Sequence, residues 1–237
     1  MRTLLAAYWL CISLSAWSRQ PTWAKKATAF ASECDPARPA ACQTVSVVSP
    51  DGKNRIEVRY RNSKGALSPY LMIFGSGEHG QVARLPYGSS ELLWSPDSRA
   101  FFANGSLGAT SGLFVHLYRL EDLRPLDPTA RAQRAMVRTF PPCKAMYALD
   151  SCKEVDRHPE YNMSAIDWAT DTSLVVMAEV PCTSYYGGIM CQVMAYEIEI
   201  PTGKILNSIS PSQFKQRWQG SMAWDFRIPD AAEYQPE

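Results

Sequence analysis

The feature that most constrains the fold is a short pattern that occurs three times in the chain. Residues 92–102 and 166–176 each place an apolar residue, a tryptophan and an aspartate before a polar turn and a second apolar run. Residues 47–56 form a third copy, with Val48 at the tryptophan position and one extra turn residue. Proline presets φ and aspartate bonds backbone groups across a turn, so each copy predicts a hairpin. The predicted structural turn residues are Asp51, Asp97 and Asp171.

A second pair of apolar segments follows each copy, so each unit is predicted to hold about four short antiparallel strands. These later segments are 70–74 with 81–85, 113–120 with 123–126, and 193–200 with 204–206. The 46 residues from Asp51 to Asp97 match one propeller blade, and the 74 from Asp97 to Asp171 imply an insertion of about 30. The predicted fold class is all-β with minor α: three blade-like antiparallel meander units plus a short helical insertion.

Two of the turns resemble those of a known repeat. Trp94-Ser-Pro-Asp97-Ser-Arg and Ser49-Pro-Asp51-Gly-Lys are similar to the turn of TolB-type and WD-like β-propeller repeats. The likeness covers residues 45–206, although the third copy lacks the proline. Three blades do not close a ring, which typically takes four to eight. The resemblance therefore implies blade-like sheets in a partial or open propeller, and it implies neither a partner nor an activity.

The first 24 residues are predicted to be a secretory signal peptide. Arg2 precedes an apolar run over residues 4–14, which is too short to cross a bilayer as a helix. A cut after Ala24 leaves one domain, 25–237, whose net charge is −1 (22 basic minus 23 acidic residues). An uncleaved amphipathic anchor is the alternative, and the cut itself stays open because residues 29–31 also fit the small-x-small rule. No later stretch is long and apolar enough to be a transmembrane helix.

Six cysteines follow the signal segment in three closely spaced pairs. The spacing predicts three local disulfides, Cys34–Cys42, Cys143–Cys152 and Cys182–Cys191. Together with the signal segment they predict a periplasmic or extracellular protein. No metal site is expected, because the chain has no Cys-x-x-Cys and its histidines (His79, His116 and His158) lie near no paired ligands.

The insertion, at about 127–162, holds the predicted binding residues. Asp127 and Pro128 begin a helix over residues 129–140. One side of this helix carries Arg131, Arg134 and Arg138. These arginines form either a cationic face for an anionic partner or envelope lipid, or simply the solvated face of a packed helix.

The chain ends offer covers for the open sheet edges. A second short helix is predicted from Ser210 and Pro211 to Trp218, and residues 25–45 and 211–230 are available to cover the edges. Uncovered edges would allow self-association.

Catalytic and cofactor motifs are absent from the sequence. Residues 75–80 are glycine-rich but predict a hairpin turn, since the ending of a phosphate loop is missing. Asp97 and Asp171 are expected on separate units, which disfavours a carboxylate pair for glycoside hydrolysis. His116 is predicted to be a core histidine. The balance of 24 basic and 23 acidic residues gives no reason to expect nucleic-acid binding.

The favoured function is therefore a non-catalytic binding module without a cofactor. Its partner is a protein or an envelope component, contacted through the loops and the insertion. Two alternatives remain: an envelope-acting hydrolase with its site at the blade centre, and a subunit whose open arc is completed by a second copy.

Overall fold

The protein is described by a computed structural model that covers residues 23–30, 37, 42, 44–63, 66–75, 81–85, 89–108, 111–139, 161–180, 193–200 and 202–223. Its strands are β1 (Thr28–Ala29), β2 (Val45–Val48), β3 (Arg55–Ser63), β4 (Ala66–Phe74), β5 (Gln81–Arg84), β6 (Ser89–Trp94), β7 (Ala100–Gly108), β8 (Ser111–Arg119), β9 (Pro125–Leu126), β10 (Asn162–Thr170), β11 (Ser173–Glu179), β12 (Val193–Glu199) and β13 (Ile205–Ile209). The helices are α1 (Pro128–Thr139), α3 (Pro211–Trp218) and the 3-10 turn η3 (Gln219–Ser221).

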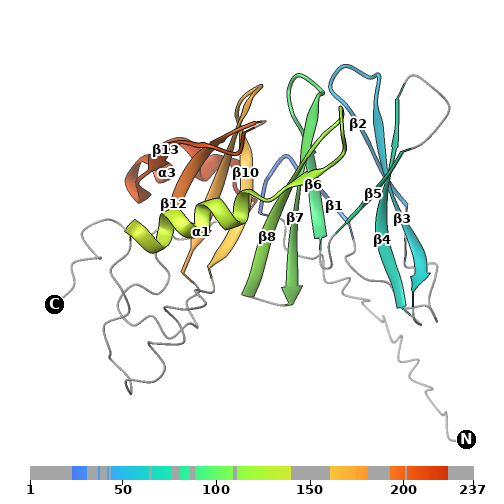
Figure 1. Ribbon diagram of the computed structural model, residues 1–237, viewed down its shortest axis with the longest axis horizontal. Helices are drawn as coiled ribbons and strands as arrows, with labels where there is room; N and C mark the ends of the chain where they lie inside the picture. The colour runs from blue at the N-terminus through green and yellow to red at the C-terminus, as the bar shows by residue number, and fades with distance from the viewer. Residues whose placement is uncertain are drawn as a thin grey trace, which may run out of the picture.

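The strands form three antiparallel sheets, each in the order of the sequence. The first sheet is β2-β3-β4-β5, the second is β1-β6-β7-β8-β9, and the third is β10-β11-β12-β13 (Figure 1). The expectation of a mostly β fold with minor α and three antiparallel sheets is confirmed; the second sheet gains β1 as a fifth strand beyond the four expected. β4 and β5 pair antiparallel, as expected for the strands of a hairpin, and residues 76–80 of the predicted turn lie outside the described residues.

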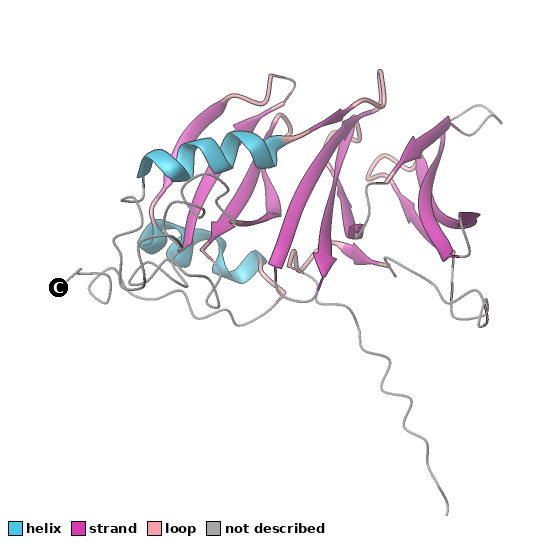
Figure 2. Ribbon diagram, turned by 60° about the horizontal axis from the view of Figure 1, so that its bottom comes forward, coloured by secondary structure: helices cyan, strands magenta, loops and turns pink. Residues whose placement is uncertain are grey.

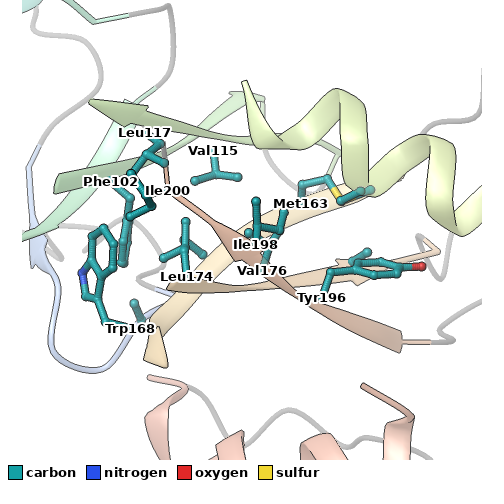
Figure 3. Close-up of a cluster of buried hydrophobic side chains, with 14 of the residues drawn as sticks. Phe102, Val115, Leu117, Met163, Trp168, Leu174, Val176, Tyr196, Ile198 and Ile200 are labelled. Atoms are coloured by element: carbon teal, nitrogen blue, oxygen red, sulfur yellow. The ribbon is translucent and has the colours of Figure 1, made fainter. Parts of the chain in front are cut away.

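The sheets are packed face to face in a row. Leu71 of the first sheet and Phe101 of the second lie in one hydrophobic cluster. Phe102 of the second sheet packs against Trp168 of the third, with ring centroids 5.9 Å apart, in a cluster that α1 completes (Figure 3). Phe214 of α3 covers the other side of the third sheet. Phe101 and Phe102 point to opposite faces because strand side chains alternate, so the second sheet is buried on both sides.

The first two repeated turns have the same hydrogen bonds. Ser49 Oγ donates to Asp51 Oδ1 at 2.6 Å, and Asp51 Oδ1 also accepts the N–H of Lys53 at 3.0 Å. Ser95 and Asp97 form the equivalent bonds in the second turn, at 2.7 and 3.0 Å. The next residue has positive φ in both turns, +72° at Gly52 and +63° at Ser98. The two turns have equal length, because Val48 pairs with Arg55 as Trp94 pairs with Phe101. The expected extra residue in the first copy was therefore wrong.

The third turn is built differently. Thr170 pairs with Ser173, so only two residues form the turn. Thr170 Oγ1 accepts the N–H of Thr172 at 3.1 Å, and this is the role that an aspartate has in the other two turns. The turn closes early, which leaves Asp171 exposed at its tip. The predicted turn-bonding role of Asp171 is thus filled by Thr170.

Replacing Gly52 by alanine is expected to lower the free energy of unfolding by about 1 kcal/mol. No atom lies within 4 Å of the position a Cβ would take, so the cost comes from the positive φ alone. Gly220 also has open space around its Cβ position but no positive φ, so Gly220→Ala is the matched control and should be neutral. Urea unfolding of both variants measures the difference. Equal stability of the two would show that the turn relaxes without strain.

Asparagine side chains link the second and third sheets. Asn104 Nδ2 donates to the carbonyl of Ala165, and Asn104 Oδ1 accepts the N–H of Ala165, both at 2.7 Å. Ala165 lies on β10, the edge strand of the third sheet, beside a register shift between Ala165 and Asp167. In the opposite direction, Asn162 Oδ1 of β10 accepts the N–H of Leu113 in β8 at 3.4 Å. These bonds fix the position of one sheet on the next.

Helix α1 is part of the core rather than a detachable loop. It begins one residue earlier than predicted, with Asp127 Oδ1 accepting the N–H of Ala130 at 3.4 Å. The buried hydroxyl of Thr129 accepts the N–H of Val115 at 3.0 Å and donates to its carbonyl at 3.2 Å. Ala132 is fully buried. Removing this helix would therefore expose the edge of β8.

Segments near the two chain ends cover the row of sheets. Trp23 packs in the same cluster as α3, Ala24 forms a bridge with Met222, and β1 pairs with β6. As predicted, Ser210 begins α3 in a capping box with Gln213. We call residues 23–30 the N-terminal strap. The described helices include none with the length and apolar character needed to cross a bilayer.

Candidate functional site

A concave surface lies at the end of the sheets where the repeated turns are found. It has a volume of about 700 Å³ and is lined by the β2–β3, β6–β7 and β10–β11 turns and by residues that follow β8 and β12. Two contacts join the first two turns: the N–H of Asp51 donates to Ser98 Oγ at 3.0 Å, and Trp94 Nε1 donates to the carbonyl of Val47 at 3.1 Å. We call this surface the turn-end depression.

The lining of the turn-end depression carries both signs of charge in nearly equal number. The acidic residues are Asp51, Asp97, Glu121 and Asp171, and the basic residues are Lys53, Arg99 and Arg119. Such a lining suits a polar ligand that itself carries both charges better than a simple anion or cation.

The fixed bonds of the turns hold several of these charges in place. Hydrogen bonds from the Ser49 hydroxyl and the Lys53 N–H lower the pKa of Asp51 below its ordinary value, so its carboxyl stays ionised. Arg119 forms ion pairs with Glu121 at 2.9 Å and with Asp122 at 2.5 Å. An ionised, already bonded carboxylate is suited to binding and poorly suited to donating a proton.

The structure brings together residues that the sequence treated separately. Asp97 and Asp171 come from different sheets, as expected, yet both line the turn-end depression together with Asp51. The signal available in the sequence was the equal position of the turn in each repeat. The equivalent turns come close together only because the sheets stack with their turns at the same end.

The predicted cationic face of the insertion lies away from this surface. Arg131 and Arg134 are exposed on α1, and neither lines the depression. Arg131 lies over Gly203, where an added Cβ would come within 2.9 Å of its Nε, so it also has a packing role. The side chain of Arg138 and the rest of the insertion to residue 160 lie outside the described residues.

Most of the predicted disulfides lie outside the described residues. Cys42 is disulfide-bonded. Its partner lies among the cysteines that the structure does not describe, namely Cys11, Cys34, Cys143, Cys152, Cys182 and Cys191. The pairing in three local bridges stays a prediction.

Glu91 is a buried carboxyl group whose pKa is strongly raised. Its side chain is fully buried on β6 and accepts hydrogen bonds from the backbone N–H groups of Trp23 at 2.8 Å and Ala24 at 3.1 Å, and from the side chain of Asn104. Burial raises its pKa to about 7, although these donors act in the opposite direction. Its oxygens are enclosed by the N-terminal strap, so Glu91 supports the fold and is not open to a substrate.

The stability of the protein is expected to fall as the pH rises from about 4.5 to 7. In this range the folded state keeps the Glu91 proton, whereas the unfolded state has released it. The full effect is about 3 kcal/mol, and it is present below pH 4.5 and lost above pH 7. Glu91→Gln should remove most of this slope in unfolding free energy measured from pH 4.5 to 8. Two smaller contributions of opposite sign remain, because burial raises the pKa of Glu179 and lowers that of His116.

Glu197→Gln is the control for this measurement. Hydrogen bonds from Ser173 and Asn207 lower the pKa of Glu197, so its contribution to stability is lost only below about pH 4.5, and Glu197→Gln should leave the slope from pH 4.5 to 8 unchanged. Identical pH profiles for the wild-type protein and Glu91→Gln would contradict the prediction.

His116 lies half-buried on β8, in contact with aromatic rings. Its ring meets Phe114 edge-on at a centroid distance of 5.1 Å, and burial lowers its pKa. Its Nδ1 has no hydrogen-bond partner among the described residues. Within the described ranges no cluster of three His, Cys, Asp or Glu side chains is placed to hold a metal ion. His79 and His158 lie outside those ranges.

The chain matches no protein-family model, and it matches no curated protein sequence.

Proposed function

We propose that the protein is a non-catalytic binding module that holds a polar ligand in the turn-end depression. The observation that carries this proposal is the convergence of equivalent turns from three sheets on one concave surface of about 700 Å³. Binding sites are commonly formed by loops that a rigid scaffold positions. Here the scaffold is the row of stacked sheets, and the inter-turn bond from Asp51 to Ser98 fixes two of the loops.

We further propose that the three sheets are blades of a partial TolB-type propeller. Each contains a four-stranded meander, to which β1 adds a fifth strand in the second sheet; the first turn of each meander is in an equivalent place, and neighbouring sheets pack face to face. These features support blades without requiring a closed ring.

The proposed compartment is the periplasm or the exterior of the cell. The apolar segment over residues 4–14 and the six paired cysteines support it, and Cys42 is disulfide-bonded. Mass spectrometry of the unreduced, digested protein from a cell envelope or culture medium is expected to show three local crosslinks. A crosslink between different cysteine pairs would overturn the pairing, and free thiols throughout would count against the compartment.

The envelope-acting hydrolase remains a second candidate because of Glu91 alone. A carboxyl group with a pKa of about 7 is typical of a general acid. Its inaccessibility under residues 23 and 24 disfavours this role. Hydrolysis of envelope glycan or peptide that is lost in Glu91→Gln, while the fold is kept, would establish it instead.

The binding proposal is tested by titrating the isotope-labelled full chain with the dipeptide Lys-Glu and following its amide resonances. Shifts are expected at Lys53, Arg99 and Thr172, and they should weaken several-fold in Arg99→Ala. Lys204→Ala, an exposed residue outside the depression, is the matched control and should bind as the wild type does. Shifts confined to other parts of the molecule, or none with any charged dipeptide, would refute the assignment of this surface.

A further inference from the structure

The two ends of the row of sheets differ. The third sheet is covered by α3, whose Phe214 and Trp218 are buried against it. Figure 2 shows both helices toward this end and the first sheet at the other. One face of the first sheet packs against the second sheet through Ile56, Val58 and Leu71. On its opposite face Val48 is 56% exposed, and the side chains of Arg55 and Arg59 are 48% and 41% exposed.

This outer face of the first sheet alternates arginines with aromatic rings. Strand alternation places Arg55, Arg59 and Arg61 on it, and the register sets Phe74 opposite Arg55 and Tyr70 opposite Arg59. The guanidinium carbon of Arg55 lies 4.8 Å from the Phe74 ring centroid, and that of Arg59 lies 5.6 Å from the same centroid. Arg61 lies 5.8 Å from the ring of Tyr70. Stacking on rings holds the guanidinium groups in fixed positions, which lowers the entropy cost of binding an anion.

The outer face carries an excess of positive charge. Glu57 forms ion pairs with Arg55, at 2.9 Å, and with Arg59. Among the described side chains of this face, three arginines minus one glutamate give a net charge of +2. No carboxylate among the described side chains pairs with Arg61. Each guanidinium has five N–H donors in a planar fork, so donors remain for an incoming carboxylate.

We propose that the outer face of the first sheet is a docking surface for an acidic segment of a partner protein. The partner's carboxylates would lie on Arg55, Arg59 and Arg61, and its apolar side chains would cover Val48 and Phe74. Arginine, aromatic and methionine side chains are enriched at the centres of protein interfaces, and Met72 lies between the two rings along β4. This inference goes beyond the proposed ligand binding, because it uses a different surface of the molecule.

A second copy of this chain fits the surface less well. Two copies meeting through this face would oppose arginine to arginine, a like-charge contact that disfavours association. The exposed faces of the two helices offer no acidic complement, since α1 carries Arg131 and Arg134 and α3 carries Lys215 and Arg217. None of these three surfaces of a second copy supplies the charge complement, so the proposal assigns it to another protein.

The test uses the full chain and fluorescein-labelled poly-L-glutamate, followed by anisotropy at 50 and 300 mM salt. Arg55→Gln combined with Arg61→Gln removes two charges and leaves Glu57 paired with Arg59. This double variant should bind at least tenfold more weakly, and the binding of the wild type should weaken with salt. Lys25→Gln with Lys204→Gln removes two exposed charges elsewhere and should stay within twofold of the wild type. Circular dichroism of each variant checks that the fold is kept.

Three outcomes would overturn the proposal. Equal binding by the Arg55/Arg61 variant and the wild type would exclude this face. Loss of binding in Arg131→Gln with Arg134→Gln would assign it to α1 instead. Heparin binding that is as tight as that of poly-L-glutamate, and equally lost in the Arg55/Arg61 variant, would show a general polyanion surface. Failure of the turn-end depression to bind Lys-Glu would not change any of these three results. The two proposals can therefore fail separately.

Discussion

A chain that begins at Lys25 is expected to be about 3–6 kcal/mol less stable at pH 8 than a chain that begins at Arg19. The shorter chain lacks the N–H groups of Trp23 and Ala24, which donate to the buried carboxylate of Glu91 at 2.8 and 3.1 Å. A hydrogen bond to a charged group contributes about 1.5–3 kcal/mol, and an unpaired buried charge costs more. The shorter chain also loses the bridge between Ala24 and Met222 and the packing of Trp23.

Thermal and urea unfolding of the two purified chains measure this difference. A loss of this size corresponds to a fall in Tm of roughly 10 °C for a domain of this length. The loss should shrink as the pH falls toward 5, because Glu91 then becomes neutral. Equal stability at pH 8 would show that water or the new N-terminus replaces the missing donors. The result also tests the predicted signal-peptide cleavage site. Cleavage after Ala24 would remove two of the three hydrogen-bond donors to Glu91 and leave only the Asn104 side chain.

Asn104→Ala is expected to destabilise the protein by about 4 kcal/mol. Asn104 pairs with both backbone groups of Ala165 at 2.7 Å and donates to Glu91. Its removal leaves two buried backbone groups and one carboxylate oxygen short of a partner, and each such group costs about 1–3 kcal/mol. The matched control is Asn207→Ala, because Asn207 is exposed and its 2.9 Å bond to Glu197 should contribute under 0.5 kcal/mol.

A second substitution keeps this prediction testable if Asn104→Ala does not fold. Asn104→Asp retains an acceptor for the Ala165 N–H but places a second carboxyl group beside Glu91. Its stability should recover as the pH falls from 8 to 5, because protonation of either group relieves the repulsion. A stability loss that is independent of pH would contradict the proposed contact with Glu91.

Several elements follow from local patterns in the sequence. The Ser-Pro-Asp turns, the strands around them, α1 and the capping box of α3 depend on hydrogen bonds between residues a few positions apart. Such bonds form in much the same way whatever surrounds them, so residue type and spacing suffice to predict them. The third turn was the exception, because a two-residue turn anchored by Thr170 has a different pattern from the other two.

The candidate sites depend on contacts across long stretches of sequence. Glu91 meets Trp23 at a separation of 68 residues, Asn104 meets Ala165 at 61, and Lys26 meets Asp167 at 141. The alternation of residues in β3 predicts that one of its faces is buried. It does not predict that the first sheet lies at the end of the row of sheets with its arginine face exposed.

By itself the sequence therefore determined the kind and order of the secondary structure, because turn chemistry and strand alternation act within a few residues. Only the tertiary structure decided which turns would share one depression, which carboxylate would be enclosed by the strap and which sheet face would stay open. These outcomes depend on how whole sheets stack, which is set by the packing of many side chains at once and not by any single local pattern.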